Sequence, residues 1–454
     1  MKKKILAGVL SAATVLTLTT GLTGCKENGS AGYKDDNSGT KLRIACWNWE
    51  VREFVEAYYK APEGITIEWV QNTNEGGAYQ NTLDTLLKNN ETASADDKID
   101  IFLAEADYIK KYSCSDYSLD MKNFISDTSN MYDYVLNAGK NEDGVLKAVS
   151  FQACPAALIV RRSIAKDVLG TDDPAVVQSK LDTWEKFEAV AVDAKAKGYY
   201  MTGSSMDTYR VFMNGSNDSF INNNKFSLTP AFEQWFKQAE TFDKNGYCTK
   251  GELWSDEKSD EMAGSGKMMC TFGPSWYYAF SMGTAYADGT GSYGDWMIVK
   301  GPQEHFWGGT WMLAARGTDN TDAVKDFLNK FCNDDAMAEL LIKGENLINF
   351  DTKEPKVNPQ FPNNKRVIEK YAKDTSYGNG FLGGQNDIAI LSEIVTKIQW
   401  DTTKHTEIDQ TLNETLPQMI HQYTTGTEGV TSKEQALNKF YNALAAVNPD
   451  ITHD

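Results

Sequence analysis

The sequence predicts an α/β fold divided into two lobes. A chain of 454 residues is long enough for about three domains of roughly 150 residues, or for two larger lobes. A composition that is 41% hydrophobic, with 11 Trp, 21 Tyr and 20 Phe, provides enough apolar surface for substantial cores. Strand and helix patterns alternate along the chain, which is typical of sheets covered by helices.

The first lobe is predicted from strands and helices that follow one another closely. Apolar residues alternate with polar or small ones over 41–47 and 65–69, which predicts two strands. Helical spacing of apolar residues predicts a helix over 78–90, and a short apolar run predicts a strand over 99–104. A sheet built in this way has its ligand crevice at the ends of the strands.

The second half of the chain carries helix signals. Asp182 is a candidate N-cap with Glu185 three residues on, and Gly198 follows the predicted end of that helix. A strand is predicted over 311–315. Further helices are predicted from Thr321, from Ile388 and over 436–447.

Residues 1–24 are predicted to be a lipoprotein signal peptide. Three lysines at positions 2–4 precede an apolar run that ends in Leu-Thr-Gly-Cys, with the cysteine at Cys25. This ending resembles the lipobox of bacterial lipoproteins, which implies cleavage before Cys25, a lipid on its thiol and anchoring on the extracellular face of the cell membrane. A plain signal peptide with an incidental cysteine is the alternative. Residues 25–40, rich in Gly, Ser, Asn and charges, are predicted to be a flexible tether.

Composition argues against several classes of function. A net charge of −18 disfavours binding to a nucleic acid. The four histidines never stand at i, i+4, so no zinc site is indicated, and we expect no cofactor. Apart from Cys25, the cysteines include no C-x-x-C pair, and we expect reduced core thiols rather than disulfides.

The sequence does not support a site for nucleotide binding or for nucleophilic catalysis, because the segments that resemble such motifs lack the required neighbours. The G-x-G-x-x-G at 289–294 precedes a predicted strand over 295–299 instead of a helix. The segment 264–268 lacks the Ser or Thr of a phosphate loop, and no Gly-x-Ser-x-Gly elbow occurs. A glycosidase remains an alternative, because its two carboxyl groups need only be about 5 to 10 Å apart in space.

Several segments resemble the extracellular solute-binding proteins of bacterial ABC sugar importers, the family of maltose-binding protein. DIFLAEAD at 100–107 resembles the family strand whose final acid reaches a sugar hydroxyl, and DTWEKF at 182–187 resembles a family helix start. GKMMCTFGPSW at 266–276 is similar to the segment whose tryptophan commonly stacks on the ligand, although Met268, Met269 and Cys270 depart from it. Another departure is Ile99, where the family has proline.

This resemblance implies a periplasmic-binding-protein-like fold with an interlobe cleft and a hinge. Lobe 1 would comprise 41–150 plus about 308–370, and lobe 2 would comprise 151–307 plus about 371–454. The hinge is expected near residues 149–154 and 303–310. The resemblance further implies a monomer that binds an oligosaccharide without altering it and delivers it to ABC transporter permease subunits.

Candidate ligand-binding residues follow from the chemistry of sugars. A sugar ring presents a C–H face edged by hydroxyls, so its site needs aromatic platforms and planar hydrogen-bonding side chains. We expect the site to include Trp47, Trp49, Asp107, Gln152, Arg210, Trp276 and Trp307. The resemblance supports Asp107 and Trp276, whereas the others rest on their positions after a strand, at a proposed crossing between lobes or in a polar loop. Core packing or a solvated surface is the alternative for each.

The expected function is therefore binding and not catalysis. Besides a cell-surface glycosidase, the same fold binding a peptide or another solute remains an alternative.

Overall fold

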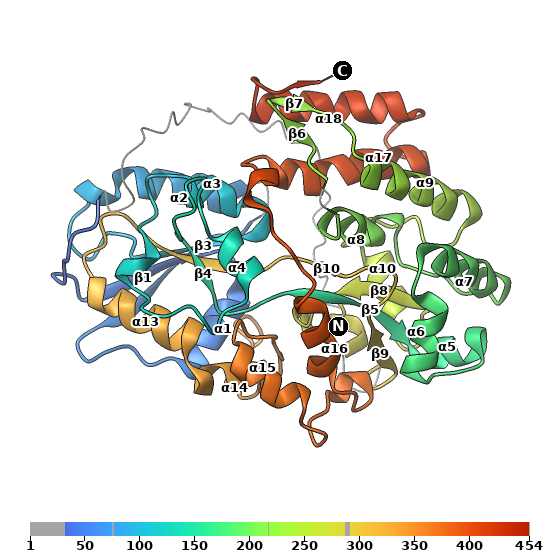
Figure 1. The fold of residues 1–454 in the computed structure, drawn as a ribbon, viewed down its shortest axis with the longest axis horizontal. Coiled ribbons are helices and arrows are strands. Elements are labelled where there is room, and N and C mark those ends of the chain that lie inside the picture. The colour runs from blue at the N-terminus through green and yellow to red at the C-terminus, as the bar shows by residue number, and fades with distance from the viewer. Residues whose placement is uncertain (1–31, 75–76, 217, 287–290, 454) are drawn as a thin grey trace.

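The computed structural model describes residues 32–74, 77–216, 218–286 and 291–453 (Figure 1). The predicted signal peptide and Cys25 therefore lie outside the described residues. Within the described part of the chain, no helix is long and apolar enough to cross a membrane.

Lobe 1 is built on a mixed sheet with the strand order β2-β1-β3-β11-β4. β1 pairs in parallel with β2 and β3, whereas β11 runs antiparallel to β3 and β4. The strands are β1 (Lys41–Cys46), β2 (Thr66–Gln71), β3 (Ile101–Glu105), β4 (Val149–Ser150) and β11 (Thr310–Ala314). The strands predicted in this lobe are confirmed, and the late strand β11 returns the chain to the first sheet.

Helices cover both faces of this sheet because successive strand residues point to opposite sides. Leu42 and Ile44 pack with Phe54 and Phe327 on one face, while Ala45 packs in a second core on the other. The helices are α1 (Trp49–Tyr58), α2 (Ala78–Asn89), α3 (Ile109–Ser113), α4 (Asp133–Ala138), α13 (Thr321–Asn333), α14 (Asp335–Lys343) and α15 (Lys365–Ala372). A small hairpin, β12 (Leu347–Ile348) and β13 (Pro355–Lys356), lies beside α1.

The described end of the predicted tether, residues 32–40, lies along lobe 1 instead of extending freely. The backbone N–H of Thr321 donates to Asp36 O at 2.9 Å, and that of Asp322 donates to the Asn37 side chain at 2.8 Å. The first N–H groups of a helix have no partner within the helix. Asp36 and Asn37 therefore satisfy N–H groups in the first turn of α13.

Lobe 2 is centred on β5 (Pro155–Arg161), which pairs antiparallel with its neighbours. These are β8 (Cys270–Gly273), β9 (Trp296–Val299) and β10 (His305–Phe306). The helices around this sheet are α5 (Arg162–Leu169), α6 (Pro174–Leu181), α7 (Trp184–Ala196), α8 (Tyr209–Asn214), α10 (Asp256–Met262), α11 (Trp276–Phe280), α12 (Gly283–Tyr286) and α16 (Asp387–Val395). The backbone carbonyls of Gly264 and Gly266 accept hydrogen bonds from the Arg161 guanidinium. A phosphate loop would instead point backbone N–H groups at an anion.

A helical layer completes lobe 2 at one end (Figure 1). There α9 (Pro230–Asn245) packs against α17 (Leu416–Thr425), which packs against α18 (Lys433–Val447). A small sheet of β6 (Ile221–Asn222), β7 (Lys225–Phe226) and β14 (Thr452–His453) lies beside α18. The predicted closing helices are confirmed.

Two predicted helix caps are displaced by one residue. Thr183, not Asp182, caps α7 by accepting from Lys186 N, because Asp182 ends the preceding helix α6. Gly198 follows α7 with φ +84°, as predicted. Similarly, Asn320 occupies the N-cap position of α13 without a capping hydrogen bond from its side chain, and Thr321 is the first residue of the helix.

The chain crosses between the two sheets from β4 to β5 and from β10 to β11, so the predicted hinge segments coincide with these crossings. All six cysteines of the described residues are free, and all but Cys114 are buried. Burial raises the pKa of the Cys46 thiol to about 12, which keeps it protonated.

Candidate functional site

The end of β3 places two carboxylates at the boundary between the lobes. Asp107 lies in the 3-10 turn η3 (Ala106–Tyr108), and its backbone N–H donates to Glu105 Oε2 at 2.7 Å. Asp107 is only 5% exposed. Burial, followed by the charge of Asp107, raises the pKa of Glu105 well above its ordinary value.

An ion pair joins the two lobes at this point. Arg210 on α8 of lobe 2 donates from Nη1 and Nη2 to the two oxygens of Asp107 in lobe 1, each at 2.6 Å. Asn413, from the π-helical turn η8 (Thr411–Thr415), donates to Asp107 Oδ1 at 2.8 Å. The structure thus brings together Asp107 and Arg210, two of the predicted polar residues. The two parallel hydrogen bonds of such a pair fix the orientation of the guanidinium relative to the carboxylate.

Beside the ion pair lies a cluster of aromatic rings. Trp307 is 5% exposed, and its ring centroid is 5.7 Å from Trp276, 5.4 Å from Tyr277 and 5.7 Å from Trp254. Trp276 Nε1 donates to Trp307 O at 3.2 Å. The Arg210 guanidinium lies 5.9 Å from the Trp307 ring, so the aromatic cluster and the ion pair form one continuous site.

Gly308 permits the close approach of these groups. Its φ is +70°, and a Cβ added there would lie 3.2 Å from the Trp276 ring and 3.4 Å from Glu105 Oε1. Gly308, which lies within the expected hinge segment 303–310, therefore lets the lobe 1 acid approach the lobe 2 indole.

A buried network supports the aromatic cluster from within lobe 2. Lys258 Nζ lies 2.6 Å from Asp207 Oδ1 and donates to Tyr277 OH at 2.9 Å. Thr271 Oγ1 contacts the same carboxylate and the same phenol at 3.4 Å. Tyr277 is thereby held beneath Trp307.

Trp47 follows β1 at the strand end, as predicted. Its half-buried ring packs against Tyr79 at 5.4 Å and Tyr108 at 5.7 Å. Tyr108 follows Asp107 directly in the sequence. Because β1 and β3 are parallel neighbours, Trp47 and Asp107 lie at the same edge of the sheet.

Two other predicted residues have different surroundings. Trp49 is the first residue of α1, since Asn48 caps that helix, and it stacks on Phe350 at 4.1 Å. Gln152 is buried at the first crossing, where its Nε2 lies 3.4 Å from Cys154 Sγ and 3.4 Å from Gln360 Oε1. Trp49 thus packs on the hairpin side of lobe 1. Gln152 reaches the aromatic cluster only through Cys154, whose carbonyl accepts from Trp307 N at 3.1 Å.

Several residues of this candidate site were not among those predicted from the sequence. Glu105 lies within the segment DIFLAEAD at 100–107, and Tyr277 directly follows Trp276, so the motifs could have indicated both. Trp254 stands alone in an acidic segment, and Asn413 is 306 positions from its partner Asp107. No local pattern indicates either of them.

A Ser, His and Asp also meet in lobe 2, but in a structural arrangement. Ser205 Oγ donates to Asp243 at 2.8 Å and lies 3.1 Å from His421 Nδ1. In a nucleophilic triad the histidine bridges the other two residues, whereas here the serine does. All three side chains are buried, and they tie the turn η5 (Ser205–Thr208) to α9 and α17.

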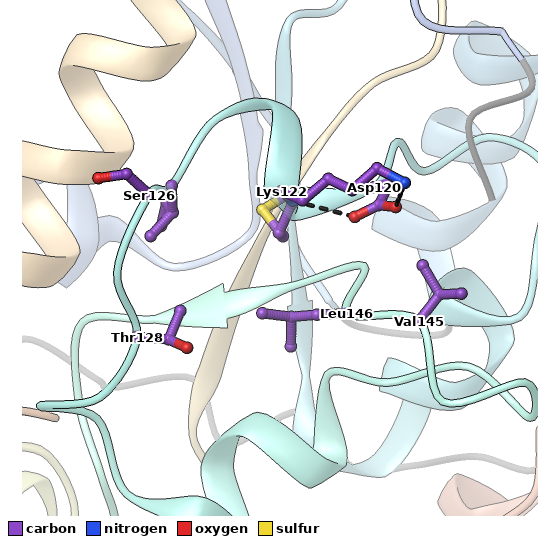
Figure 2. A pocket seen from close by; sticks show the side chains of 8 residues that line it. Asp120, Lys122, Ser126, Thr128, Val145 and Leu146 are labelled. Carbon is purple, nitrogen blue, oxygen red and sulfur yellow. Dashed lines mark hydrogen bonds and ion pairs between the residues drawn. The ribbon is translucent and has the colours of Figure 1, made fainter.

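A hollow of about 320 Å³ lies elsewhere on lobe 1 (Figure 2). It is lined by Asp120, Met121, Lys122, Ile125, Ser126, Thr128, Val145 and Leu146, with the Asp120–Lys122 ion pair at 2.8 Å on its wall. None of these is aromatic, so this hollow lacks a ring platform. Among the residues that the structure describes, no cluster of three or more His, Cys, Asp or Glu side chains could hold a metal ion.

The model of the bacterial extracellular solute-binding protein family matches residues 53–365. The chain belongs to this family. No curated protein sequence matches it significantly. The resemblance to solute-binding proteins that the sequence motifs indicated is confirmed, and so is the predicted two-lobed α/β fold.

Solved structures share the fold of this solute-binding protein at low sequence identity. One is the ABC transporter associated binding protein from B. animalis subsp. lactis Bl-04 in complex with β-1,6-galactobiose, with a TM-score of 0.66, 17% identity, and 92% of this chain and 100% of that chain covered. Another is the sugar-binding protein MalE from Xanthomonas citri, with a TM-score of 0.64, 13% identity, and coverage of 89% and 96%. A third is an ABC substrate-binding protein from Listeria monocytogenes in complex with cycloalternan, with a TM-score of 0.64, 14% identity, and coverage of 90% and 99%.

Proposed function

We propose that this solute-binding protein is a lipid-anchored receptor that captures an oligosaccharide between its lobes and delivers it to an ABC transporter permease. The observation that carries the proposal is the continuous site made by the aromatic cluster of lobe 2 and the Asp107–Arg210 pair across the boundary. The sugars named with two of the structural neighbours support the same ligand class.

The chemistry of this site suits a sugar. The half-buried Trp276 offers an indole face for the C–H side of a ring, with the buried Trp307 packed against it, and Trp47 contributes a further half-buried ring from lobe 1. Asp107, Arg210 and Asn413 are hydrogen-bonding groups at the edge of the cluster. Because these groups come from both lobes, a ligand that contacts them all would favour the closed arrangement.

Membrane attachment through Cys25 is part of the proposal and rests on the lipobox-like ending at 22–25. The mass of the protein extracted from membranes tests it, since a lipid on Cys25 adds the mass of its acyl chains to residues 25–454. A durable anchor would keep the receptor close to its permease.

The first experiment is a fluorescence titration of the protein against a panel of α- and β-linked oligosaccharides, followed by calorimetry on those that bind. Trp276→Ala is expected to weaken binding by at least about tenfold, roughly 1.4 kcal/mol, because one stacking face is lost. Tyr293→Ala is the matched control, since its exposed ring packs against Tyr286 and Phe381, away from the aromatic cluster. Unchanged affinity in Trp276→Ala would contradict the role of this indole.

Prolonged incubation separates a receptor from a hydrolase. The proposed receptor returns its oligosaccharide intact, as chromatography of the mixture would reveal. Steady release of shorter sugars, abolished by changing a carboxylate of the site, would support a cell-surface glycosidase instead. Binding of peptides but of no sugar would support a non-sugar solute.

A further inference from the structure

Two aromatic side chains on the surface of lobe 2 continue the aromatic cluster outward. Trp254 is 53% exposed and Phe280 is 61% exposed, although each has a large apolar ring. Their ring centroids are 6.3 Å apart, so they form one patch. Single exposed apolar residues are common, but adjoining exposed aromatics mark an interaction site more often.

This patch connects directly with the rings at the lobe boundary. Trp254 lies 5.7 Å from Trp307, and Phe280 lies 6.1 Å from Trp276. Exposure increases along the series from Trp307, which is buried, through the half-buried Trp276 to Trp254 and Phe280. The rings are inclined to one another, with Phe280 at 74° to Trp254 and at 67° to Trp276, so they present separate contacts to neighbouring sugar rings and not one flat platform.

The loop that carries Trp254 is held in place by hydrogen bonds. Thr249 Oγ1 accepts from Gly251 N at 3.2 Å and donates to Gly203 O at 2.6 Å. Ser255 caps α10, the helix that carries Lys258 and thus the network beneath Tyr277. An exposed ring on a well-held backbone loses little conformational freedom when a ligand stacks on it.

The charge around the patch narrows the choice of occupant. Glu252, Asp256 and Glu257 are exposed beside Trp254. These carboxylates would repel an anionic lipid surface or a phosphorylated ligand, whereas they can accept hydrogen bonds from sugar hydroxyls. A neutral carbohydrate chain fits both the rings and the charge.

We propose that Trp254 and Phe280 form an outer stacking subsite, so that the ligand is an oligosaccharide that extends from the lobe boundary over α11 to the surface of lobe 2. This inference rests on the proposed function and adds a preference for chain length. The inner rings hold the first sugar units, and the outer pair holds the units that follow.

The test uses an oligosaccharide series of one linkage, from disaccharide upward, chosen from the sugars that bind the unaltered protein. Trp254→Ala, Phe280→Ala and the double variant are compared with Tyr293→Ala by calorimetry. We expect the double variant to lose at least about fivefold more affinity for the longest ligand than for the disaccharide. Trp254→Phe should recover most of the loss, because a phenyl ring still stacks.

Equal losses at every chain length, or no loss at any length, would overturn the outer subsite while leaving the proposed function intact. If no oligosaccharide binds the unaltered protein, the proposed function itself fails. Quenching by acrylamide provides a second readout. The emission of Trp254 is obtained as the difference in fluorescence between the unaltered protein and Trp254→Phe. Long ligands should reduce the quenching of this emission by acrylamide, whereas the disaccharide should not. Equal protection by both would contradict the proposal.

Discussion

At the scale of single residues, His305 illustrates how the boundary between lobes constrains ionisation. The imidazole is buried, its Nδ1 lies 3.3 Å from Gln303 O, and its Nε2 has no hydrogen-bond partner among the described residues. Burial lowers its pKa to about 4, despite the raising effect of the Gln303 carbonyl. The side chain is therefore neutral at pH 7 in the folded protein.

His305 makes stability depend on pH in a predictable direction. Because its folded pKa of about 4 lies below an unfolded value near 6.5, the unfolded chain takes up the proton first as pH falls. The free energy of unfolding should therefore decrease between pH 6.5 and 4, by up to about 3 kcal/mol from this group. His305→Gln should lack this component in denaturant titrations at pH 7 and pH 4.5. Parallel pH profiles for the two proteins would contradict the assignment.

At the scale of elements, the aromatic cluster depends on how α10, α11 and β8 are fastened together. Lys258 of α10 reaches Asp207 and Tyr277, and Thr271 of β8 contacts both partners. Both charges of the Lys258–Asp207 pair are buried. Loss of one partner would leave an uncompensated buried charge, which is far more costly than loss of an exposed pair.

Lys258→Met is expected to lower the free energy of unfolding by about 3 to 5 kcal/mol, because the buried Asp207 carboxylate would lose its cationic partner. The double variant Asp207→Asn/Lys258→Met should recover much of this loss. Denaturant unfolding of the two variants measures the difference. A loss below about 1 kcal/mol in the single variant would indicate that the network does not hold the elements together.

At the scale of the whole molecule, the Asp107–Arg210 pair links lobes whose sheets are otherwise connected through the crossings. A second link is the hydrogen bond from Gln80 of lobe 1 to Gln410, which precedes η8, at 2.7 Å. Such contacts stabilise the closed arrangement only while the lobes remain together. The balance between open and closed forms should therefore respond to their removal.

Arg210→Gln is expected to open the ligand-free protein. Truncating one member of a buried charge pair costs about 2 to 5 kcal/mol, which shifts the ratio of closed to open molecules by more than tenfold. Small-angle X-ray scattering should then report a larger radius of gyration. Lys186→Gln is the control, because it breaks an exposed pair with Asp182 within lobe 2. An identical radius for all three proteins would argue against an interlobe tie.

Much of the fold was predictable because the spacing of apolar residues along the chain differs between strands and helices. Alternation identified β1, β2 and β11, and helical spacing identified α2, α7 and α13, with errors of one residue where two elements adjoin, as at Asp182. For the site, the motif resemblance led to Trp276 and the proposed crossing between lobes led to Trp307, and the structure brings these two into contact. The flexible tether over 25–40 stays a prediction, and its described end at 32–40 has polar groups with partners 285 positions away.

The sequence by itself determined the alternation of strands and helices, the family and the residue types suited to a sugar, since each depends on local spacing or on a contiguous motif. Only the tertiary structure decided which of those residues meet. It joined Asp107 to Arg210 and Asn413, added Trp254 to the aromatic cluster, and turned Trp49 toward Phe350. The physical reason is that contacts between positions hundreds of residues apart are set by how sheets and helices pack, and no local pattern along the chain records that packing.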